Sequence, residues 1–192
     1  MILPVVAYGL PILRKVCTDL GPDYPALTQL IDDMWQTMYH SNGMGLAAPQ
    51  INKSIRLFVI DTQQVYEKSD EESIADFDGE IGFKKVFINA HILELNGASW
   101  SCDEGCLSLP GFREEVSRES EVVLEYCDES FNKKVESFKG LNARVILHEY
   151  DHIEGKLFID HISLIKKKLL KKRLDDISAG RVKPGYKMLF PK

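Results

Sequence analysis

The sequence predicts an α+β domain in which most strands follow one another directly and helices are few. Three observations support this class. Strand-like segments run consecutively through the middle of the chain, helical patterns are confined to residues 25–40, 142–154 and 163–178, and 192 residues with 44% hydrophobic content suffice for one sizeable core. Runs of strands with few helices are typical of α+β domains, whereas a parallel α/β fold would alternate the two.

The first part of the chain predicts one amphipathic helix and one buried strand. Apolar residues recur at helical spacing over residues 25–40, and Gly43 can supply the left-handed residue that ends such a helix. Residues 43–50 hold two glycines, two alanines and a proline, so the backbone there can approach a ligand closely, although a plain turn into a strand is equally compatible with this composition. The apolar run 55–61 predicts a buried strand.

Residues 62–83 form an acidic insertion. Its seven acidic residues are Glu67, Asp70, Glu71, Glu72, Asp76, Asp78 and Glu80. Because few apolar residues accompany these charges, we expect a solvated and mobile insertion loop.

Four further strands are predicted after the insertion. They lie near residues 85–90, 98–102, 121–127 and 133–139. The dipeptide Pro110-Gly111 predicts a turn between the second and third of these strands. We find no internal repeat, and we expect residues 1–192 to form a single domain.

Two helices complete the predicted fold. The first runs from about Asn142 to Glu154, is apolar on most sides, and should end at Gly155, which suggests a helix that passes through the core. The second spans roughly 163–178 and is followed by a tail to residue 192. Its expected apolar face comprises Leu164, Leu169, Leu170, Leu174 and Ile177, against a basic face of Lys166, Lys167, Lys168, Lys171, Lys172 and Arg173.

Composition excludes several classes of protein. The net charge of −5 argues against DNA or RNA as the main partner. No apolar run approaches the ~18 residues of a membrane span, and the first residues lack the pattern of a signal peptide, so we expect a cytoplasmic monomer. The four cysteines (Cys17, Cys102, Cys106 and Cys127) form no CxxC pair, and we expect them to be reduced.

The segment His148-Glu149-Tyr150-Asp151-His152 matches the HExxH pattern of zinc-type hydrolases. Histidines four residues apart share one helical face, so both rings can reach one metal ion, and Glu149 projects about 100° around the helix, where an acid–base group would stand. Chance would produce this pattern in roughly one such chain in a hundred, and a surface helix with solvated histidines is the plain alternative. The apolar flanks favour a buried helix.

The third protein ligand of a metal hydrolase decides its class. A zinc protease with the extended pattern would need a histidine at position 158, where this chain has Phe158, and Asp175 and Asp176 lie in a lysine-rich segment. The remaining candidates are His161, Asp160 and the cysteine segment 102–106. A different alternative is a structural zinc module closed by Cys102, Cys106, His148 and His152, which would leave no position for a catalytic water.

The chain resembles the peptide deformylase family in three motifs. They are Gly43-Met44-Gly45-Leu46-Ala47-Ala48-Pro49-Gln50, Glu104-Gly105-Cys106-Leu107-Ser108 and His148-Glu149-Tyr150-Asp151-His152. The resemblance covers residues 2 to about 165. It implies a compact α+β fold with the HExxH helix between β-sheets, and an enzyme that removes the N-formyl group from the N-terminal methionine of newly synthesised polypeptides.

The resemblance also implies roles for individual residues. The implied metal ligands are Cys106, His148 and His152. Glu149 would act as general base and then acid, while Gln50 and the backbone N–H of Leu107 would stabilise the developing oxyanion. The residues implied to contact the substrate are Met44, Gly45, Gly105, Arg113 and Val145, with Met44 and Val145 around the methionine side chain.

The resemblance implies one divalent metal ion, ferrous iron in the cell, although the ligand set fits Zn²⁺ equally well and Ni²⁺ is a further option. The implied partner is an N-formylmethionyl peptide. The basic segment 166–173 suggests a weak contact with the ribosome, against the plainer interpretation of a solvated face. An HExxH metallopeptidase and the structural zinc module stay as alternative functions.

Overall fold

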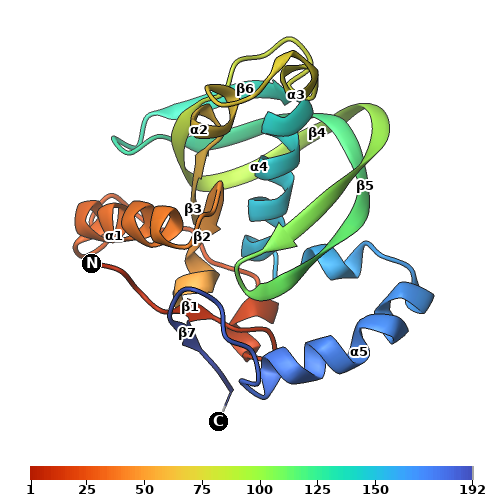
Figure 1. Cartoon of the computed structure of the whole chain (residues 1–192). Helices are drawn as coiled ribbons and strands as arrows, with labels where there is room; N and C mark the ends of the chain where they lie inside the picture. Colours follow the sequence, from red (N-terminus) through yellow and green to blue (C-terminus); the bar gives the residue numbers. More distant parts are fainter. Residues whose placement is uncertain (192) are drawn as a thin grey trace.

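The computed structural model describes residues 1–191 and is built on a five-stranded antiparallel sheet that curves around one central helix (Figure 1). The strands follow the order β2-β3-β4-β5-β6 across the sheet. Their bounds are β2 Gly45–Ala47, β3 Leu57–Asp61, β4 Lys84–Cys106, β5 Leu109–Cys127 and β6 Lys133–Lys139. A separate pair joins the two ends of the chain, with β1 Val5–Val6 parallel to β7 Met188–Leu189. The predicted α+β class is confirmed.

The helices lie around and inside this sheet. They are α1 Leu27–His40, α2 Gln63–Tyr66, α3 Glu71–Ala75, α4 Gly140–Ile153 and α5 Leu164–Ser178, with short 3₁₀ helices η1 Pro11–Arg14, η2 Ala48–Ile51 and η3 Phe158–Asp160. Among the described residues 1–191, no helix is long and apolar enough to cross a membrane.

Helix α4 is the centre of the fold, as Figure 1 shows. Ala143, Ile146 and Ile153 are fully buried, and they pack with Phe58 and Phe87 of the sheet into one apolar cluster. The helix ends before Gly155, whose φ of +69° and close approach to Arg14 leave no room for a side chain. The HExxH segment is therefore held by core packing on both sides.

Strands β4 and β5 form one long hairpin, so the separate strands predicted at 85–90 and 98–102 are a single strand. Register shifts between Ile88 and His91, and again between Asn96 and Ser99, bend this strand without ending it. The middle of β4 is mostly exposed, so its sequence lacks the alternation of apolar and polar residues that predicts a strand. The turn predicted at Pro110-Gly111 lies three residues earlier in the structure, at Leu107–Ser108, because Cys106 pairs with Leu109.

The acidic insertion 62–83 is more structured than we predicted. It contains α2 and α3, and its Phe77 is fully buried with its ring edge against Tyr66 at a centroid distance of 5.0 Å. The carbonyl of Asp76 accepts a hydrogen bond of 2.7 Å from the N–H of Leu141 in the first turn of α4. One aromatic anchor and one backbone bond thus fasten a mostly acidic segment, and we propose that it belongs to a single domain formed by the whole chain.

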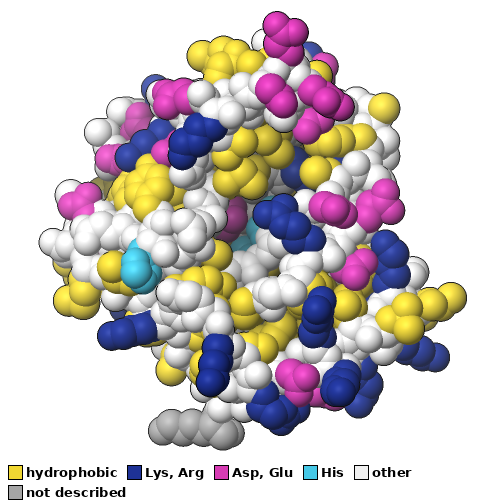
Figure 2. Space-filling view, viewed as in Figure 1, with side chains coloured by type: hydrophobic (Ala, Val, Ile, Leu, Met, Phe, Trp, Pro, Cys, Tyr) yellow, Lys and Arg dark blue, Asp and Glu magenta, His cyan; other side chains and the backbone are white. Residues whose placement is uncertain are grey.

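Helix α5 packs through its C-terminal half only. Leu170, Leu174 and Ile177 are buried, whereas Leu164 and Leu169 are 77% and 79% exposed. The prediction that all five apolar residues face the core is therefore wrong for these two. Figure 2 shows blue Lys and Arg side chains gathered on the face where α5 runs in Figure 1.

Candidate active site

Three side chains of types that can bind a metal ion meet between α4 and the β4–β5 hairpin. His148 and His152 lie one turn apart on α4, and Cys106 is the last residue of β4. One donor atom from each lies within 4.8 Å of the other two, and Cys106 Sγ is 3.3 Å from His152 Nε2. A thiolate and two imidazoles form a sulfur–nitrogen set that suits Zn²⁺, Fe²⁺ or Ni²⁺, so these residues fit a metal ion.

The other proposed ligands are elsewhere. His161 Nε2 lies 2.7 Å from Asp151 Oδ2, and Asp160 pairs with Arg14 and caps Leu157. Cys102 also stays outside the group; its Sγ has Asp103 O as polar neighbour at 3.9 Å. Within residues 1–191, then, the cluster offers three donors and lacks the fourth that a closed structural zinc module would require.

Glu104 fixes the orientation of His148 from behind. Its Oε2 lies 2.8 Å from His148 Nδ1, and Arg118 and Arg144 donate to the same carboxylate at 2.6 and 3.0 Å. Burial would raise the pKa of Glu104, but His148 and Arg118 hold it well below its usual range. The ionised Glu104 therefore accepts a hydrogen bond from Nδ1–H of His148, so the lone pair of Nε2 is the one that can bind a metal.

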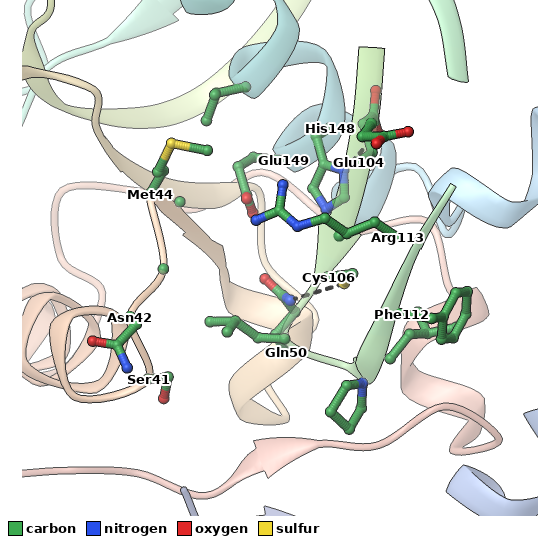
Figure 3. Close-up of a pocket in the computed structure, with 18 of the residues that line it drawn as sticks. Ser41, Asn42, Met44, Gln50, Glu104, Cys106, Phe112, Arg113, His148 and Glu149 are labelled. Carbon is green, nitrogen blue, oxygen red and sulfur yellow. Dashed lines mark hydrogen bonds and ion pairs between the residues drawn. The ribbon is translucent and has the colours of Figure 1, made fainter. Parts of the chain in front are cut away.

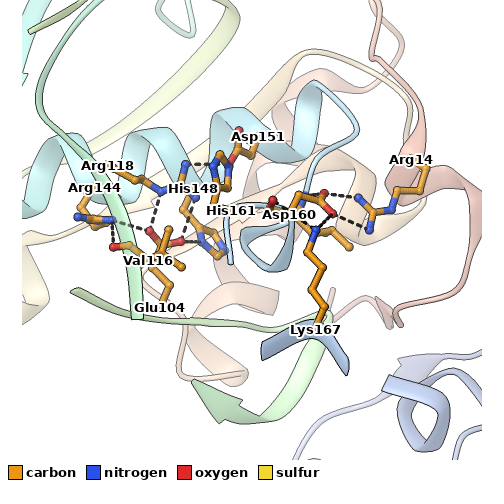
Figure 4. A network of polar contacts seen from close by, with 11 residues as sticks. Arg14, Glu104, Val116, Arg118, Arg144, His148, Asp151, Asp160, His161 and Lys167 are labelled. Carbon is orange, nitrogen blue, oxygen red and sulfur yellow. Dashed lines mark hydrogen bonds and ion pairs between the residues drawn. The ribbon is translucent and has the colours of Figure 1, made fainter. Parts of the chain in front are cut away.

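A chain of ionic contacts extends this support to the surface, as Figure 4 shows. Arg118 also donates to Asp151 at 2.8 Å, and Asp151 contacts His161. The supporting roles of Glu104, Arg118, Arg144 and Asp151 were not predicted from the sequence. The only signal for them was the presence of charges inside apolar segments, since such charges are stable only when they are paired.

The environment of Cys106 favours the thiolate. Burial opposes ionisation of the thiol, but the adjacent His152 and His148 lower the pKa of Cys106 to about 5. The thiolate is the form that binds metals, and it is present at neutral pH.

Glu149 lies in the same pocket without a partner for one of its oxygens. The side chain is 4% exposed, and its Oε2 has no hydrogen bond to any described residue. Burial raises the pKa of Glu149 to about 7, against the opposing effect of His148 and His152. A carboxyl group with this pKa can both accept and return a proton near neutral pH.

The amide of Gln50 is held in one orientation. Its Oε1 accepts from the N–H of Ala47 at 2.8 Å, so its NH₂ group must turn the other way. There Nε2 lies 3.5 Å from Cys106 Sγ (Figure 3) and 3.4 Å from Ser108 Oγ. A neutral donor therefore points at the sulfur of Cys106.

Gln50, Cys106, His148 and Glu149 line one cavity of about 810 Å³. Figure 2 shows the surface hollowed in front of it, with acidic and histidine side chains at the bottom. The cavity walls include every substrate residue suggested by the sequence, namely Met44, Gly45, Gly105, Arg113 and Val145, together with Gln50, Leu107, His148 and Glu149. The walls also include Pro184, Gly185 and Tyr186 from the C-terminal tail, which no sequence motif connects with the site.

The site combines three possible metal donors, a carboxylate oxygen without a partner and an open cavity. This combination is typical of a metal-dependent hydrolase. The family model described as polypeptide deformylase matches residues 2–168, and the chain belongs to this family. The predicted family and enzyme class are confirmed.

Named relatives are similar to this chain along nearly its full length. The chain is 51% identical to the peptide deformylase of Flavobacterium psychrophilum over all of this chain and 99% of that protein. It is 52% identical to that of Flavobacterium johnsoniae, with 99% and 96% covered. Among solved structures, peptide deformylase from Plasmodium falciparum matches with a TM-score of 0.78 at 34% identity, covering 92% of this chain and 95% of that one.

Proposed function

We propose that this protein hydrolyses the N-formyl group of N-formylmethionyl peptides and releases formate. The observation that carries the proposal is the position of Cys106, His148 and His152 within 4.8 Å of one another beside the unpartnered carboxylate oxygen of Glu149. Family membership supplies the substrate class, and the cavity in front of these residues is large enough for a short stretch of peptide.

Cys106, His148 and His152 would hold the metal ion. When bound, a divalent metal at this position polarises water and the formyl oxygen. Glu149 takes the proton from the attacking water and later gives it to the departing amine, which is a poor leaving group without it. The NH₂ group of Gln50 and the N–H of Leu107 donate to the oxygen on which negative charge develops.

The remaining walls would bind the substrate. Met44 and Val145 offer an apolar surface for the methionine side chain. Gly45 and Gly105 carry no side chain, so the peptide backbone can pass close to them. Arg113 is exposed at the mouth and points its guanidinium group inward (Figure 3), where it can donate to peptide carbonyl groups.

We propose Fe²⁺ as the metal in the cell, with Zn²⁺ and Ni²⁺ as ions that the same donors accept. The choice of iron rests on the family resemblance. Metal analysis of protein purified without air tests it, with iron at one equivalent as the expected result and zinc as the result against it.

We further propose a cytoplasmic monomer that meets its substrate at the ribosome. Support comes from α5, where Lys168 and Lys172 have no ion pair with any described residue, while Lys167 and Lys171 pair only at the exposed surface. Replacing these four lysines by Gln should reduce cosedimentation with ribosomes at low salt and leave hydrolysis of a short formyl-Met peptide unchanged. Unchanged cosedimentation would show that the basic face of α5 is only a solvated surface.

The mechanism is tested by Glu149→Gln. The amide cannot accept the proton, so formate release should fall by about 10²–10⁴-fold while metal content stays at the wild-type value. Glu129→Gln, at an exposed position, is the matched control and should retain full activity. Loss of metal in step with activity would make Glu149 a structural residue instead.

A further inference from the structure

The C-terminal tail reaches the active site by a route that no sequence motif indicates. Its strand β7 pairs with the buried strand β1, through bonds of 2.9 Å from Val5 N to Lys187 O and 2.8 Å from Ala7 N to Leu189 O. Met188 and Phe190 pack against the apolar cluster that includes Leu109 and Val116 of β5. This anchoring holds the preceding residues, Pro184 to Tyr186, in the wall of the catalytic cavity.

Tyr186 makes one specific contact there. Its hydroxyl donates a hydrogen bond of 2.8 Å to the carbonyl oxygen of Leu107, and its ring is half-buried. Leu107 and Ser108 are the two-residue turn between the paired residues Cys106 and Leu109. The tail therefore bonds to the turn that immediately follows the sulfur ligand.

Both carbonyl groups of this turn are bonded from outside the hairpin. Leu107 O accepts from Tyr186, and Ser108 O accepts from the N–H of Tyr8 at 2.9 Å. In the part of the chain that the structure describes, no hydrogen bond uses the N–H of Leu107. The two ends of the chain thus fix the two peptide groups that follow Leu107 and Ser108, next to the peptide group that carries the free N–H of Leu107 beside Cys106.

We propose that Tyr186 is a positioning residue for deformylation: by holding Leu107 O, its hydroxyl aims the N–H of Leu107 at the reacting oxygen. The inference rests on the proposed function. A two-residue turn with paired ends has few free torsions, so fixing one carbonyl restricts the neighbouring peptide group. A misaligned donor stabilises the transition state less, even when the substrate still binds.

Tyr186→Phe tests this, because it removes the hydroxyl and keeps the ring. In metal-loaded protein, kcat for a short formyl-Met peptide should fall by about 3–10-fold, in line with the loss of one hydrogen bond, while KM stays within about twofold. Amide hydrogen exchange over residues 104–109 should become faster, with metal content unchanged. Lys187→Ala, an exposed neighbour, is the control and should match wild type in all of these.

An unchanged kcat, an increase in KM alone, or unchanged exchange at the turn would each overturn the proposal. An increase in KM alone would make the tail only a substrate wall. Measurements well below the thermal midpoint of both variants separate a local effect from unfolding. Failure of the wild-type protein to release formate would instead reject the proposed function, and this is seen before any variant is compared.

Discussion

At the scale of single residues, the fit between Gly45 and Glu149 is the most demanding contact of the site. A Cβ atom at position 45 would lie 2.4 Å from Glu149 Oε1 and 2.7 Å from its Cδ, which is too close for either atom to remain in place. The carboxylate is the flexible partner, so it would move. The absence of a side chain at Gly45 therefore sets the position of the proposed base.

We predict that Gly45→Ala lowers kcat by about 100-fold, because a displacement near 1 Å is enough to misalign a catalytic group. Metal content should stay near one equivalent, since the three atoms nearest to the added Cβ all belong to Glu149, which is not a proposed ligand. Steady-state kinetics with metal analysis measures both. Wild-type kcat in this variant would show that the position of Glu149 is not critical.

The two cysteines of the hairpin form a matched pair. Cys106→Ser should weaken metal binding by at least about 10-fold, because a hydroxyl is a much poorer ligand than a thiolate for these ions. Cys102→Ser should bind metal as wild type does, since Cys102 is outside the donor group. Titration of the metal-free protein with Zn²⁺ measures this. Equal weakening in both variants would revive the closed zinc module.

Some of the site residues could be predicted from the sequence and others could not. His148, His152 and Glu149 follow from helical spacing, and Cys106 and Gln50 follow from the motifs of the family. Glu104 and Arg118 could not be assigned, because their meeting depends on the register that places Glu104 opposite Glu114 and on the packing of that hairpin against α4. Tyr186 lay beyond every motif, and only the β1–β7 pairing places it at the site.

At the scale of elements, the insertion 62–83 shows why composition alone gave a wrong prediction of its structure. Its charges predicted a solvated loop, yet one aromatic side chain, Phe77, is fully buried against Tyr66. A single buried ring contributes several kcal/mol, more than the surrounding exposed charges cost. The insertion also accepts a backbone bond from the start of α4, so its stability and that of the catalytic helix are linked.

We predict that Phe77→Ala lowers the free energy of unfolding by about 3–5 kcal/mol, as for other large-to-small changes in a core. Ile81→Ala, at a side chain that is 70% exposed, should change it by no more than about 0.5 kcal/mol. Urea unfolding followed by far-ultraviolet circular dichroism compares the two. Equal, small effects would show that the insertion is not anchored through Phe77.

The predicted elements were most accurate where packing decides them. Strand β6 lies at the predicted residues 133–139, and α4 differs by two residues at its start. The middle of β4 was missed because backbone pairing within a long hairpin holds it, without an apolar face. Leu164 and Leu169 were assigned to the core by helical spacing, which cannot say how far along α5 the core extends.

At the scale of the whole molecule, the site exists because four distant segments meet. Helix α4 supplies two histidines and Glu149, the β4–β5 hairpin supplies Cys106, η2 supplies Gln50, and the tail supplies Tyr186. Sequence motifs named the first three segments, and the fold explains their closeness. We infer that this assembly hydrolyses a formyl amide and leaves the peptide chain intact.

That claim is tested by the products formed from formyl-Met-Ala-Ser with protein purified without air and loaded with one equivalent of Fe²⁺. We expect formate and intact Met-Ala-Ser in equal amounts, and no reaction with the acetylated peptide of the same sequence. Cleavage between Met and Ala without formate would instead identify a metallopeptidase. No hydrolysis at full metal occupancy would contradict the catalytic role of the site altogether.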